Sequence, residues 1–371
     1  MSAEAPTAPA VPRRHPAIDG LRALALLPVV VVNFAGYATL PWSGPLAEPA
    51  PFEGLSAWVA TVLVLALLQG KGIVLLMFLF GYGLALGGAA RVRLRWLTGI
   101  GLAHGALLYC GDIVSQYALV GLWLRRRVTA RLRRLRRIVR WGLWGGGAWL
   151  VVQALASWWW PAAPDDGGGA LAPLADAGAW WQANALAFAF WLPTAMLGLG
   201  PWLLGVVALG SLAGRLRWLH HKRWRGAWAG CARWAGPVLA LNLAFAAARA
   251  EQLVGQVGPV SSMVHMALGW AAVATWVPWL LLHARWPAWL VAAGRQTLSL
   301  YLACSLVTVA AWCGWALGWR PGVVPAVLAA VALWAGLVTL AAWAARRGVR
   351  LPAEAWLAHF GRQRPRTAEA A

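Results

Sequence analysis

The chain has 371 residues, of which 61% are hydrophobic and 12% are charged, and its formal net charge is +21. A soluble domain has about 25% charged residues, so this composition excludes an ordinary soluble protein and indicates a chain that crosses the membrane many times. Nucleic acid is the usual partner of a soluble protein this basic, but the cytoplasmic loops of membrane proteins also collect Lys and Arg. We therefore predict an all-α polytopic membrane protein whose partner is the lipid bilayer, with no nucleic acid.

Apolar runs along the chain predict the membrane spans, each of which needs about 20 residues. Ten runs are candidates, two of them shorter than this, in the order 17–39, 72–90, 95–110, 112–124, 140–158, 183–212, 228–250, 260–283, 288–317 and 322–345. If the apolar run 55–69 also crossed, the arginines of 125–140 would lie outside, against the positive-inside rule. We therefore predict ten spans with both termini cytoplasmic, and one short interfacial or re-entrant helix at 55–69. The legs of the hairpin 95–124 are short, so its full crossing is left open.

The organisation expected from this pattern is a single transmembrane domain at 15–350 in the plasma (inner) membrane. Residues 1–14 are rich in Ala and Pro and are predicted to form a disordered tail, and 351–371 are predicted to form a cytoplasmic C-terminal tail. The four cysteines form no CxxC pair and lie in or near apolar runs, which indicates packing residues, with neither a metal centre nor a disulfide framework.

Polar side chains inside the first span are the first candidates for a functional site. Asp19 and Arg22 are three residues apart, so they share a helix face and can pair; an ion pair that anchors the helix is the alternative interpretation. Asn33 follows Arg22 by about three helical turns, which places the three side chains in one stripe roughly 16 Å long. We expect this stripe to face other helices, because charged groups are rare on the lipid side.

A second group of polar residues lies in "GIGLAHGALLYCGDIVSQYAL" (Gly99–Leu119). Gly101 and Gly105 form a GxxxG motif that lets another helix approach closely. His104 could act as a general base, with Asp112 to orient it and Tyr117 on the return leg. The alternatives are a helix–helix hydrogen bond for His104 and a solvated loop for Asp112.

The third group lies in "AAGRQTLSLYLACSL" (Ala292–Leu306), where Tyr301 belongs to one helical face of hydroxyl groups. Each hydroxyl can bond to its own backbone, so this stripe alone indicates little. Arg295 is either a cytoplasmic anchor or a phosphate contact. Lys71, at the start of its span, is expected to snorkel towards the interface.

Four blocks of the sequence resemble the YeiB-like membrane proteins, which carry a domain of unknown function, number 418. They are "IDGLRALALLPVVVVNF", "FLFGYGLAL", "GLAHGALLYCGDIVSQYALVG" and "AGRQTLSLYLACSL". The blocks occur in the order of the family and cover most of the chain. A fifth segment, "LPAEAWL" (Leu351–Leu357), is a degraded form of the family's Pro-Leu-Glu motif and contains Glu354.

The YeiB-like family is distantly similar to transmembrane acyltransferases, which take an acyl group from cytoplasmic acyl-CoA and pass it across the bilayer. This resemblance implies acyl-CoA as a co-substrate, no permanently bound cofactor, and a small-molecule or envelope-glycan acceptor. One group of these enzymes has a histidine where Asn33 stands. Because Asn cannot take a proton, we predict that His104, with Asp112, is the base, while Asn33 orients a carbonyl and Arg22 and Arg295 contact acyl-CoA.

Three functions therefore stay open at the level of the sequence. The first is a transmembrane acyltransferase with the residues just named. The second is a transporter or flippase for a small metabolite, in which the same stripe, including Asp19 and Tyr301, would line a path and His104 and Asp112 would carry protons. The third is a non-catalytic envelope protein in which the polar residues only hold helices together.

Overall fold

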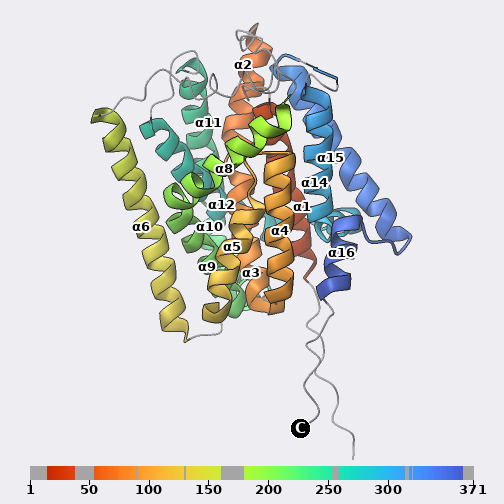
Figure 1. The fold of residues 1–371 in the computed structure, drawn as a ribbon. Coiled ribbons are helices and arrows are strands. Elements are labelled where there is room, and N and C mark those ends of the chain that lie inside the picture. Colours follow the sequence, from red (N-terminus) through yellow and green to blue (C-terminus); the bar gives the residue numbers. More distant parts are fainter. Residues whose placement is uncertain are drawn as a thin grey trace, which may run out of the picture.

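The computed structural model describes residues 15–37, 54–88, 91–128, 131–159, 179–252, 259–313, 317–319 and 321–361. These residues form helices and their connections, with no strand among them. Most of the helices run side by side along one direction and form a bundle (Figure 1). The predicted all-α class is therefore confirmed, while the predicted N-terminal tail 1–14 lies outside the described residues.

The helices of the first half follow the apolar runs of the sequence. In order they are α1 (Pro16–Tyr37), α2 (Gly54–Leu63), the π-helical segment η2 (Val64–Leu68), α3 (Lys71–Gly83), the π-helical segment η3 (Leu84–Gly88), α4 (Arg91–Leu107), α5 (Val114–Val128) and α6 (Leu132–Trp159). Helices α1 and α3 pack on each other and supply many of the buried side chains of the core, among them Leu21, Leu26, Val30 and Leu79.

The second half contains three pairs of helices joined by sharp bends. Its elements are α8 (Trp180–Gly198), α9 (Gly200–Arg215), the 3-10 segment η4 (Lys222–Trp224), α10 (Arg225–Ala232), α11 (Ala235–Gln252), α12 (Pro259–His283), α13 (Ala288–Gly294), α14 (Thr297–Trp312), α15 (Val323–Arg346) and α16 (Pro352–Gly361). The bends measure 67° between α8 and α9, 42° between the η4–α10 segment and α11, and 78° between α13 and α14.

Length and hydropathy identify four described helical segments that could each cross a membrane alone. They are Pro16–Phe34, Gly54–Gly87, Val264–His283 and Val323–Arg346, and the number rises to seven if each bent pair counts as one span. The chain is therefore a helical protein with several apolar helices fit for a membrane. The count of ten spans stays a prediction.

The segment 55–69 differs from its predicted form. Helix α2 and the η2 segment lead into α3 as parts of one apolar run of 34 residues, Gly54–Gly87. The run is interrupted at Gly70, whose φ of 77° lies in the left-handed region that favours glycine. In place of a separate interfacial or re-entrant helix, 55–69 is the first part of a long broken helix. By length and hydropathy, 54–87 counts as one candidate span, so the predicted single crossing of this region stays a prediction.

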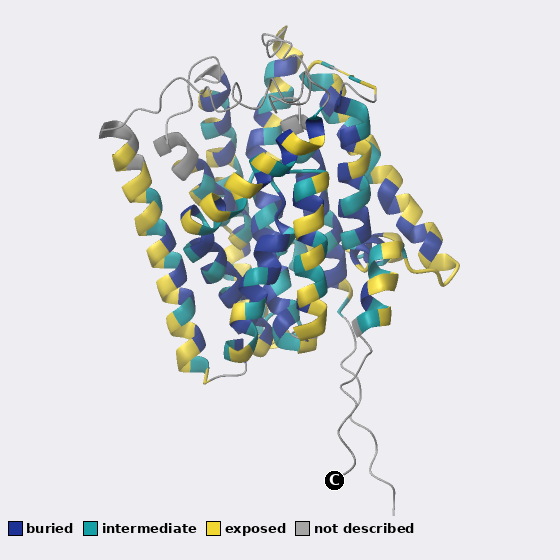
Figure 2. Cartoon of the chain, in the orientation of Figure 1, coloured by how far each residue is buried: buried dark blue, intermediate teal, exposed yellow. Residues whose placement is uncertain are grey.

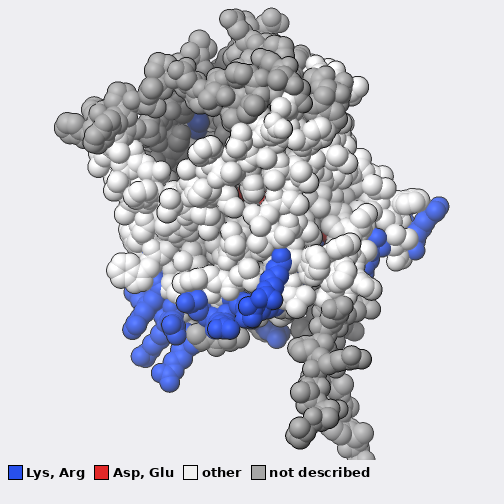
Figure 3. Space-filling view, viewed as in Figure 1, with Lys and Arg blue, Asp and Glu red and all other residues white. Residues whose placement is uncertain are grey.

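The distributions of burial and of charge are both typical of a protein in a bilayer, with apolar outward faces and basic residues at one end. Buried residues fill the centre of the bundle, whereas outward faces such as that of α6 are exposed and carry large apolar side chains, including Trp141 and Trp144 (Figure 2). Most of the Lys and Arg side chains visible in Figure 3 gather at the lower end of the bundle. We call this region, which includes the arginines at the start of α4, the end of α5 and the start of α6, the basic end.

Candidate functional site

The hairpin of α4 and α5 holds the predicted histidine and aspartate inside the bundle. Glycine at position 101 permits a very close approach, because a Cβ added there would lie 2.3 Å from the backbone nitrogen of Ser115. The short link between the two helices carries Asp112, which is completely buried, and His104 is 3% exposed. The alternative of a solvated position for Asp112 is therefore wrong, because its side chain is inside the protein.

His104 and Asp112 are directly hydrogen-bonded, as the sequence predicted. His104 Nδ1 lies 2.8 Å from Asp112 Oδ1, and the other carboxylate oxygen accepts a hydrogen bond of 2.7 Å from the backbone N–H of Ser115. The Tyr301 hydroxyl donates to Asp112 Oδ1 over 3.4 Å. This carboxylate therefore fixes the ring of His104 and, through Ser115, the start of α5.

Ser305 completes the arrangement from the far side of the imidazole. Its Oγ lies 2.8 Å from His104 Nε2, and its side chain is 1% exposed. The His104 ring thus contacts the Asp112 carboxylate through Nδ1 and the Ser305 hydroxyl through Nε2. We call these three residues the buried triad.

Helix α14 supplies both Tyr301 and Ser305 because they are four residues apart and share one face. Thr308, on the same hydroxyl stripe, bonds to the carbonyl of Cys304 in its own helix at 2.8 Å, as expected for an ordinary helix hydroxyl. Ser305 instead reaches across to α4. The sequence indicated the stripe but not this difference, because nothing along α14 alone distinguishes the two hydroxyls.

Helix α8 packs across the tip of the hairpin. The Asn184 side chain accepts a hydrogen bond of 3.0 Å from the backbone N–H of Cys110 and donates to the carbonyls of Gly105 and Ala106 at 2.9 and 2.8 Å. The Phe188 ring lies so close to Gly105 that an added Cβ would approach it to 2.2 Å. Asn184 was not predicted from the sequence, although a single Asn in an apolar run was a signal that could have found it.

Tyr117 lies beside the buried triad without a hydrogen bond to it. Its hydroxyl is buried, has no hydrogen-bond partner within the described residues, and is close enough to Asp112 for an electrostatic interaction. The structure therefore brings four predicted residues together, His104, Asp112, Tyr117 and Tyr301, and adds Ser305.

The predicted residues Asp19, Arg22 and Arg295 form a separate cluster, the Asp19 network. Arg22 Nη1 lies 3.3 Å from Asp19 Oδ1, and Arg295 Nε lies 3.2 Å from Asp19 Oδ2. The aspartate side chain is 3% exposed, whereas those of Arg22 and Arg295 are 29% and 51% exposed. Asp19 thus joins the first turn of α1 to the bend between α13 and α14.

Asn33 belongs to neither cluster. Its side chain is partly exposed, and among the described residues nothing hydrogen-bonds to its carboxamide. The expected polar stripe along α1 is therefore divided, because Asp19 and Arg22 belong to the Asp19 network and Asn33 stands apart from it.

Glu354 has a structural role that the sequence left undefined. Its Oε1 accepts hydrogen bonds from the backbone N–H groups of Leu298 and Ser299 at 2.8 and 3.2 Å, and Ser299 Oγ donates a short hydrogen bond to Oε2. Burial raises the pKa of the Glu354 carboxyl, while these hydrogen bonds act in the opposite direction. Glu354 of α16 thereby caps the N-terminus of α14, the helix that carries Ser305.

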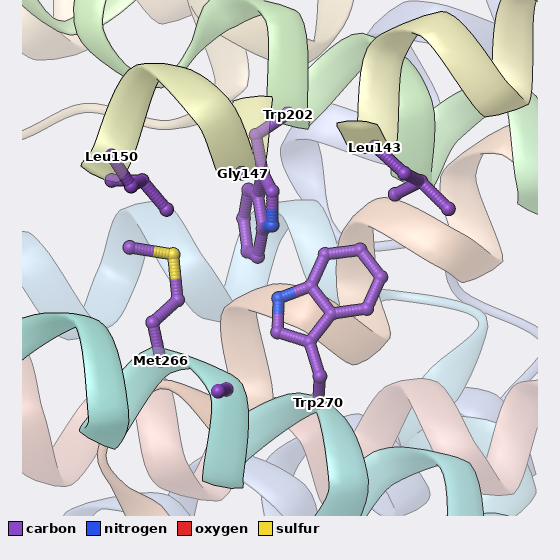
Figure 4. A pocket seen from close by; sticks show the side chains of 7 residues that line it. Leu143, Gly147, Leu150, Trp202, Met266 and Trp270 are labelled. Atoms are coloured by element: carbon purple, nitrogen blue, oxygen red, sulfur yellow. The ribbon is translucent and has the colours of Figure 1, made fainter. Parts of the chain in front are cut away.

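The apolar groove in Figure 4 lies apart from these polar clusters. It has a volume of about 320 Å³ and is lined from α6, α9 and α12 by residues that include Leu143, Trp202, Met266 and Trp270. No residue of the buried triad lines it. Nor do three or more His, Cys, Asp or Glu side chains of the described residues gather as metal ligands would.

Comparison with known protein families gives a match at the C-terminal side of the chain. The model of a family described as "Protein of unknown function (DUF418)" matches residues 213–359. This segment, less than half of the chain, is similar to the DUF418 family. The match confirms the resemblance to the YeiB-like proteins, and the DUF418 segment contains Arg295, Tyr301, Ser305 and Glu354. No curated protein and no solved structure matches the chain.

Proposed function

We propose that this protein is a membrane-embedded acyltransferase in which Ser305 is the nucleophile, His104 the general base and Asp112 the residue that orients His104. The observation that carries the proposal is the pair of 2.8 Å contacts on the two nitrogens of one imidazole, to a carboxylate and to a hydroxyl. This constellation activates serine for acyl transfer on unrelated folds, because the carboxylate fixes the tautomer and stabilises the imidazolium that forms.

The chemistry has two balanced half-reactions. In the first, Ser305 Oγ attacks the carbonyl carbon of a thioester, its proton passes to His104 Nε2, the carbon–sulfur bond breaks, and the leaving thiol takes the proton. In the second, an acceptor hydroxyl or amine gives its proton to His104 and attacks the acyl-serine. The ester bond to Ser305 then breaks, and His104 returns the proton to Oγ.

Burial of the triad favours transfer to an acceptor over hydrolysis. His104 and Asp112 have side chains that are 1% and 0% exposed, so bulk water has little access to an acyl-serine formed between them. Tight packing of α8 over the hairpin tip, through Asn184 and Phe188, contributes to this exclusion. The acceptor would then have to enter through an opening that excludes most water.

Acyl-CoA is the donor that the family resemblance implies, and the charge distribution is consistent with it. Arginines concentrate at the basic end, which the positive-inside rule assigns to the cytoplasm of the inner membrane. Arg295 is half exposed and lies at the bend two residues before the start of α14, the helix that carries Tyr301 and Ser305. Arg22 and Arg295 could bind the phosphates of CoA while keeping their contacts with Asp19, whereas Asn33 has no supporting contact for its predicted role.

The experiment is detection of the acyl-serine. Purified protein in detergent is incubated with acetyl-CoA and with a long-chain acyl-CoA, and the intact mass and the modified peptide are measured. The wild type should gain one acyl group on the peptide that contains Ser305. Ser305→Ala should gain none, and His104→Ala should form the adduct at least about 10³-fold more slowly.

Thr308→Val is the matched control, because it removes a buried hydroxyl one turn further along α14 that bonds only within its helix. It should acylate at the wild-type rate. Equal acylation of wild type and Ser305→Ala would exclude Ser305 as the nucleophile. If transfer to an added acceptor also proceeds equally in His104→Ala, the whole triad is excluded.

A small-metabolite transporter is the second candidate, and the broken helices favour it. Discontinuous spans line the substrate sites of many transporters, and here the pairs α8–α9 and α13–α14 are bent by 67° and 78°. In that case His104 and Asp112 would carry protons. Substrate uptake into proteoliposomes without any acyl donor would support transport, and its abolition by His104→Ala but not by Ser305→Ala would separate this function from acyl transfer.

A further inference from the structure

Three buried basic side chains come together from separate helices, away from the buried triad. Lys71 begins α3, Arg249 lies in the last turn of α11, and His265 is in the first part of α12. Their exposed fractions are 4%, 9% and 8%. Lys71 therefore does not snorkel to the interface, contrary to the expectation from the sequence. We call these three residues the buried basic cluster.

Within the described residues the cluster has no carboxylate partner, and its hydrogen bonds are to backbone groups, of Leu65 for Lys71 and of Gln69 for His265. Lys71 Nζ donates a hydrogen bond of 2.8 Å to the carbonyl of Leu65. Arg249 Nε and Nη1 and His265 Nε2 are buried with no hydrogen-bond partner, and no salt bridge within the described residues joins the cluster to a carboxylate. The groups interact electrostatically, Lys71 with Arg249 and His265 with both. Lys71 and Arg249 therefore concentrate positive charge, and no carboxylate of the described residues forms a salt bridge with it.

The backbone at the cluster adds further donors. The helical run breaks at Gly70, and α3 begins at Lys71 with no side-chain cap. The first N–H groups of a helix have no partner within it, and the helix dipole is positive at this end. A Cβ placed on Gly70 would have His265 Nε2, 3.9 Å away, as its only neighbour within 4 Å. This imidazole nitrogen therefore lies beside the residue that precedes α3.

Buried cations of this kind are costly unless an opposite charge accompanies them. We propose that Lys71, Arg249, His265 and the N-terminus of α3 form a binding site for an anionic group, a carboxylate or a phosphate. Arginine and helix N-termini both favour these planar or tetrahedral oxyanions, and His265 Nε2 can donate a further hydrogen bond. The site is built from α3, α11 and α12, and shares no residue with the buried triad or the Asp19 network.

The position of the cluster separates it from the arginines of the basic end. Arg249 lies near the end of α11 that reaches the opposite side of the bundle (Figure 1). Figure 3 also shows a small basic area in a recess on that side, distant from the other Lys and Arg side chains. The anion would therefore be a ligand of the other half of the membrane, either a soluble anion or the headgroup of an anionic lipid.

The test compares these two sources with the purified full-length protein. One arm measures the melting temperature in neutral detergent as inorganic phosphate replaces chloride at constant ionic strength. The other compares nanodiscs of phosphatidylcholine with nanodiscs that also contain phosphatidylglycerol. A saturable rise of at least about 2 °C is expected in one arm. A rise with phosphate assigns a soluble anion, and a rise with phosphatidylglycerol alone assigns the lipid headgroup. No rise in either arm overturns the proposal.

Variants locate the effect and distinguish a ligand site from a purely structural cluster. Lys71→Met and Arg249→Met keep the length of the side chains and remove one buried charge each. Without anion they should melt at or above the wild-type temperature, and the anion-dependent rise should disappear. Arg134→Met, at an exposed position of α6, is the matched control and should keep the full rise. The proposal is overturned if the anion-dependent rise persists in both cluster variants. It is also overturned if a cluster variant melts at a lower temperature than wild type while the melting temperature of wild type does not respond to anions.

Discussion

The buried triad and the Asp19 network each join three polar side chains from distant parts of the chain, but they do so in opposite surroundings. In the triad, the His104 and Asp112 side chains are 1% and 0% exposed. In the Asp19 network the carboxylate is buried, but the arginines Arg22 and Arg295 remain 29% and 51% exposed. Water can therefore solvate one partner in the network and has almost no access to the triad.

This difference in exposure predicts how much stability is lost when the carboxylate of each cluster is removed. If a fully buried carboxylate is removed, the donors that bonded to it remain unsatisfied in a low-dielectric interior. A half-exposed arginine that loses its carboxylate can instead be hydrated by bulk water. The Asp19 network is suited to fixing a helix end near the membrane surface. The triad is suited to chemistry that must exclude water. Four substitutions test this contrast, from the largest expected effect to the smallest.

Asp112→Ala should give the largest loss. It removes the acceptor of the Ser115 N–H and the partner of His104, so the buried donors lose their hydrogen bonds. We expect destabilisation of about 3–5 kcal/mol. The measurement is the free energy of unfolding in mixed detergent with increasing denaturant. Asp112→Asn, which keeps an acceptor oxygen, should recover more than half of this loss, and an Asp112→Ala protein as stable as wild type would contradict the contrast.

Gly101→Ala should come next, because it forces apart the two legs of the hairpin. The added Cβ would lie 2.3 Å from the Ser115 backbone nitrogen, and backbone cannot move aside as a flexible side chain can. We expect a loss of about 2–3 kcal/mol, at the upper end of overpacking effects. Gly99→Ala, on the same helix with open space around it, should be neutral or slightly stabilising in the same denaturation experiment. Equal effects at the two glycines would show that the close approach is unimportant.

Asp19→Ala should have a smaller effect, about 1 kcal/mol, since both arginines can be solvated. The loss should shrink as salt is raised from low ionic strength to 1 M, because screening weakens the wild-type contacts with Arg22 and Arg295. The loss in Asp112→Ala should not shrink. Thermal melts of both variants over the same salt series check this, and a salt-insensitive loss in Asp19→Ala would place Asp19 in the same class as the triad.

Glu354→Ala should cost about 1 kcal/mol, as expected for the loss of a helix cap, and Glu354→Gln should retain most of the capping. Burial raises the pKa of the Glu354 carboxyl, so the folded state favours the protonated form. The contribution of protonated Glu354 to the free energy of unfolding is fully present below the pKa that this carboxyl has in the unfolded chain. It is lost as the pH rises through the higher pKa of the folded state. The melting temperature of Glu354→Gln should therefore increase relative to wild type between pH 5 and pH 7. A constant difference would rule out this titration.

Much of the fold was readable from the sequence, because long apolar runs and clustered arginines are strong signals in a membrane protein. Each of the ten predicted runs overlaps a helix or a bent pair of helices. The continuity of 55–69 with the following helix was not foreseen, since a helical run through 54–87 and a separate short helix at 55–69 have the same hydropathy. The depth of Asp112 was also missed: it depends on α8 covering the hairpin, a contact between residues more than 70 positions apart.

The site was only partly predictable for a related reason. The pair of His104 and Asp112 is local, eight residues apart, and the sequence identified it. Ser305 stands 201 residues from His104, and its hydroxyl could not be told from that of Thr308 without knowing which face of α14 meets α4. Asn33 was given weight through its place in the first span, but only the packing decides its neighbours, and within the described residues nothing hydrogen-bonds to its carboxamide.

The cap that Glu354 places on α14 has a consequence for how the protein is made. Ser305 is synthesised about fifty residues before Glu354, so the helix that bears this serine forms while the backbone N–H groups of Leu298 and Ser299 still lack their acceptor. Those donors find their acceptor only when the final described helix has left the ribosome and folded back against the bundle. Premature termination just before position 354 would therefore yield a chain that contains every member of the triad but lacks the carboxylate that caps α14, the helix that carries Ser305.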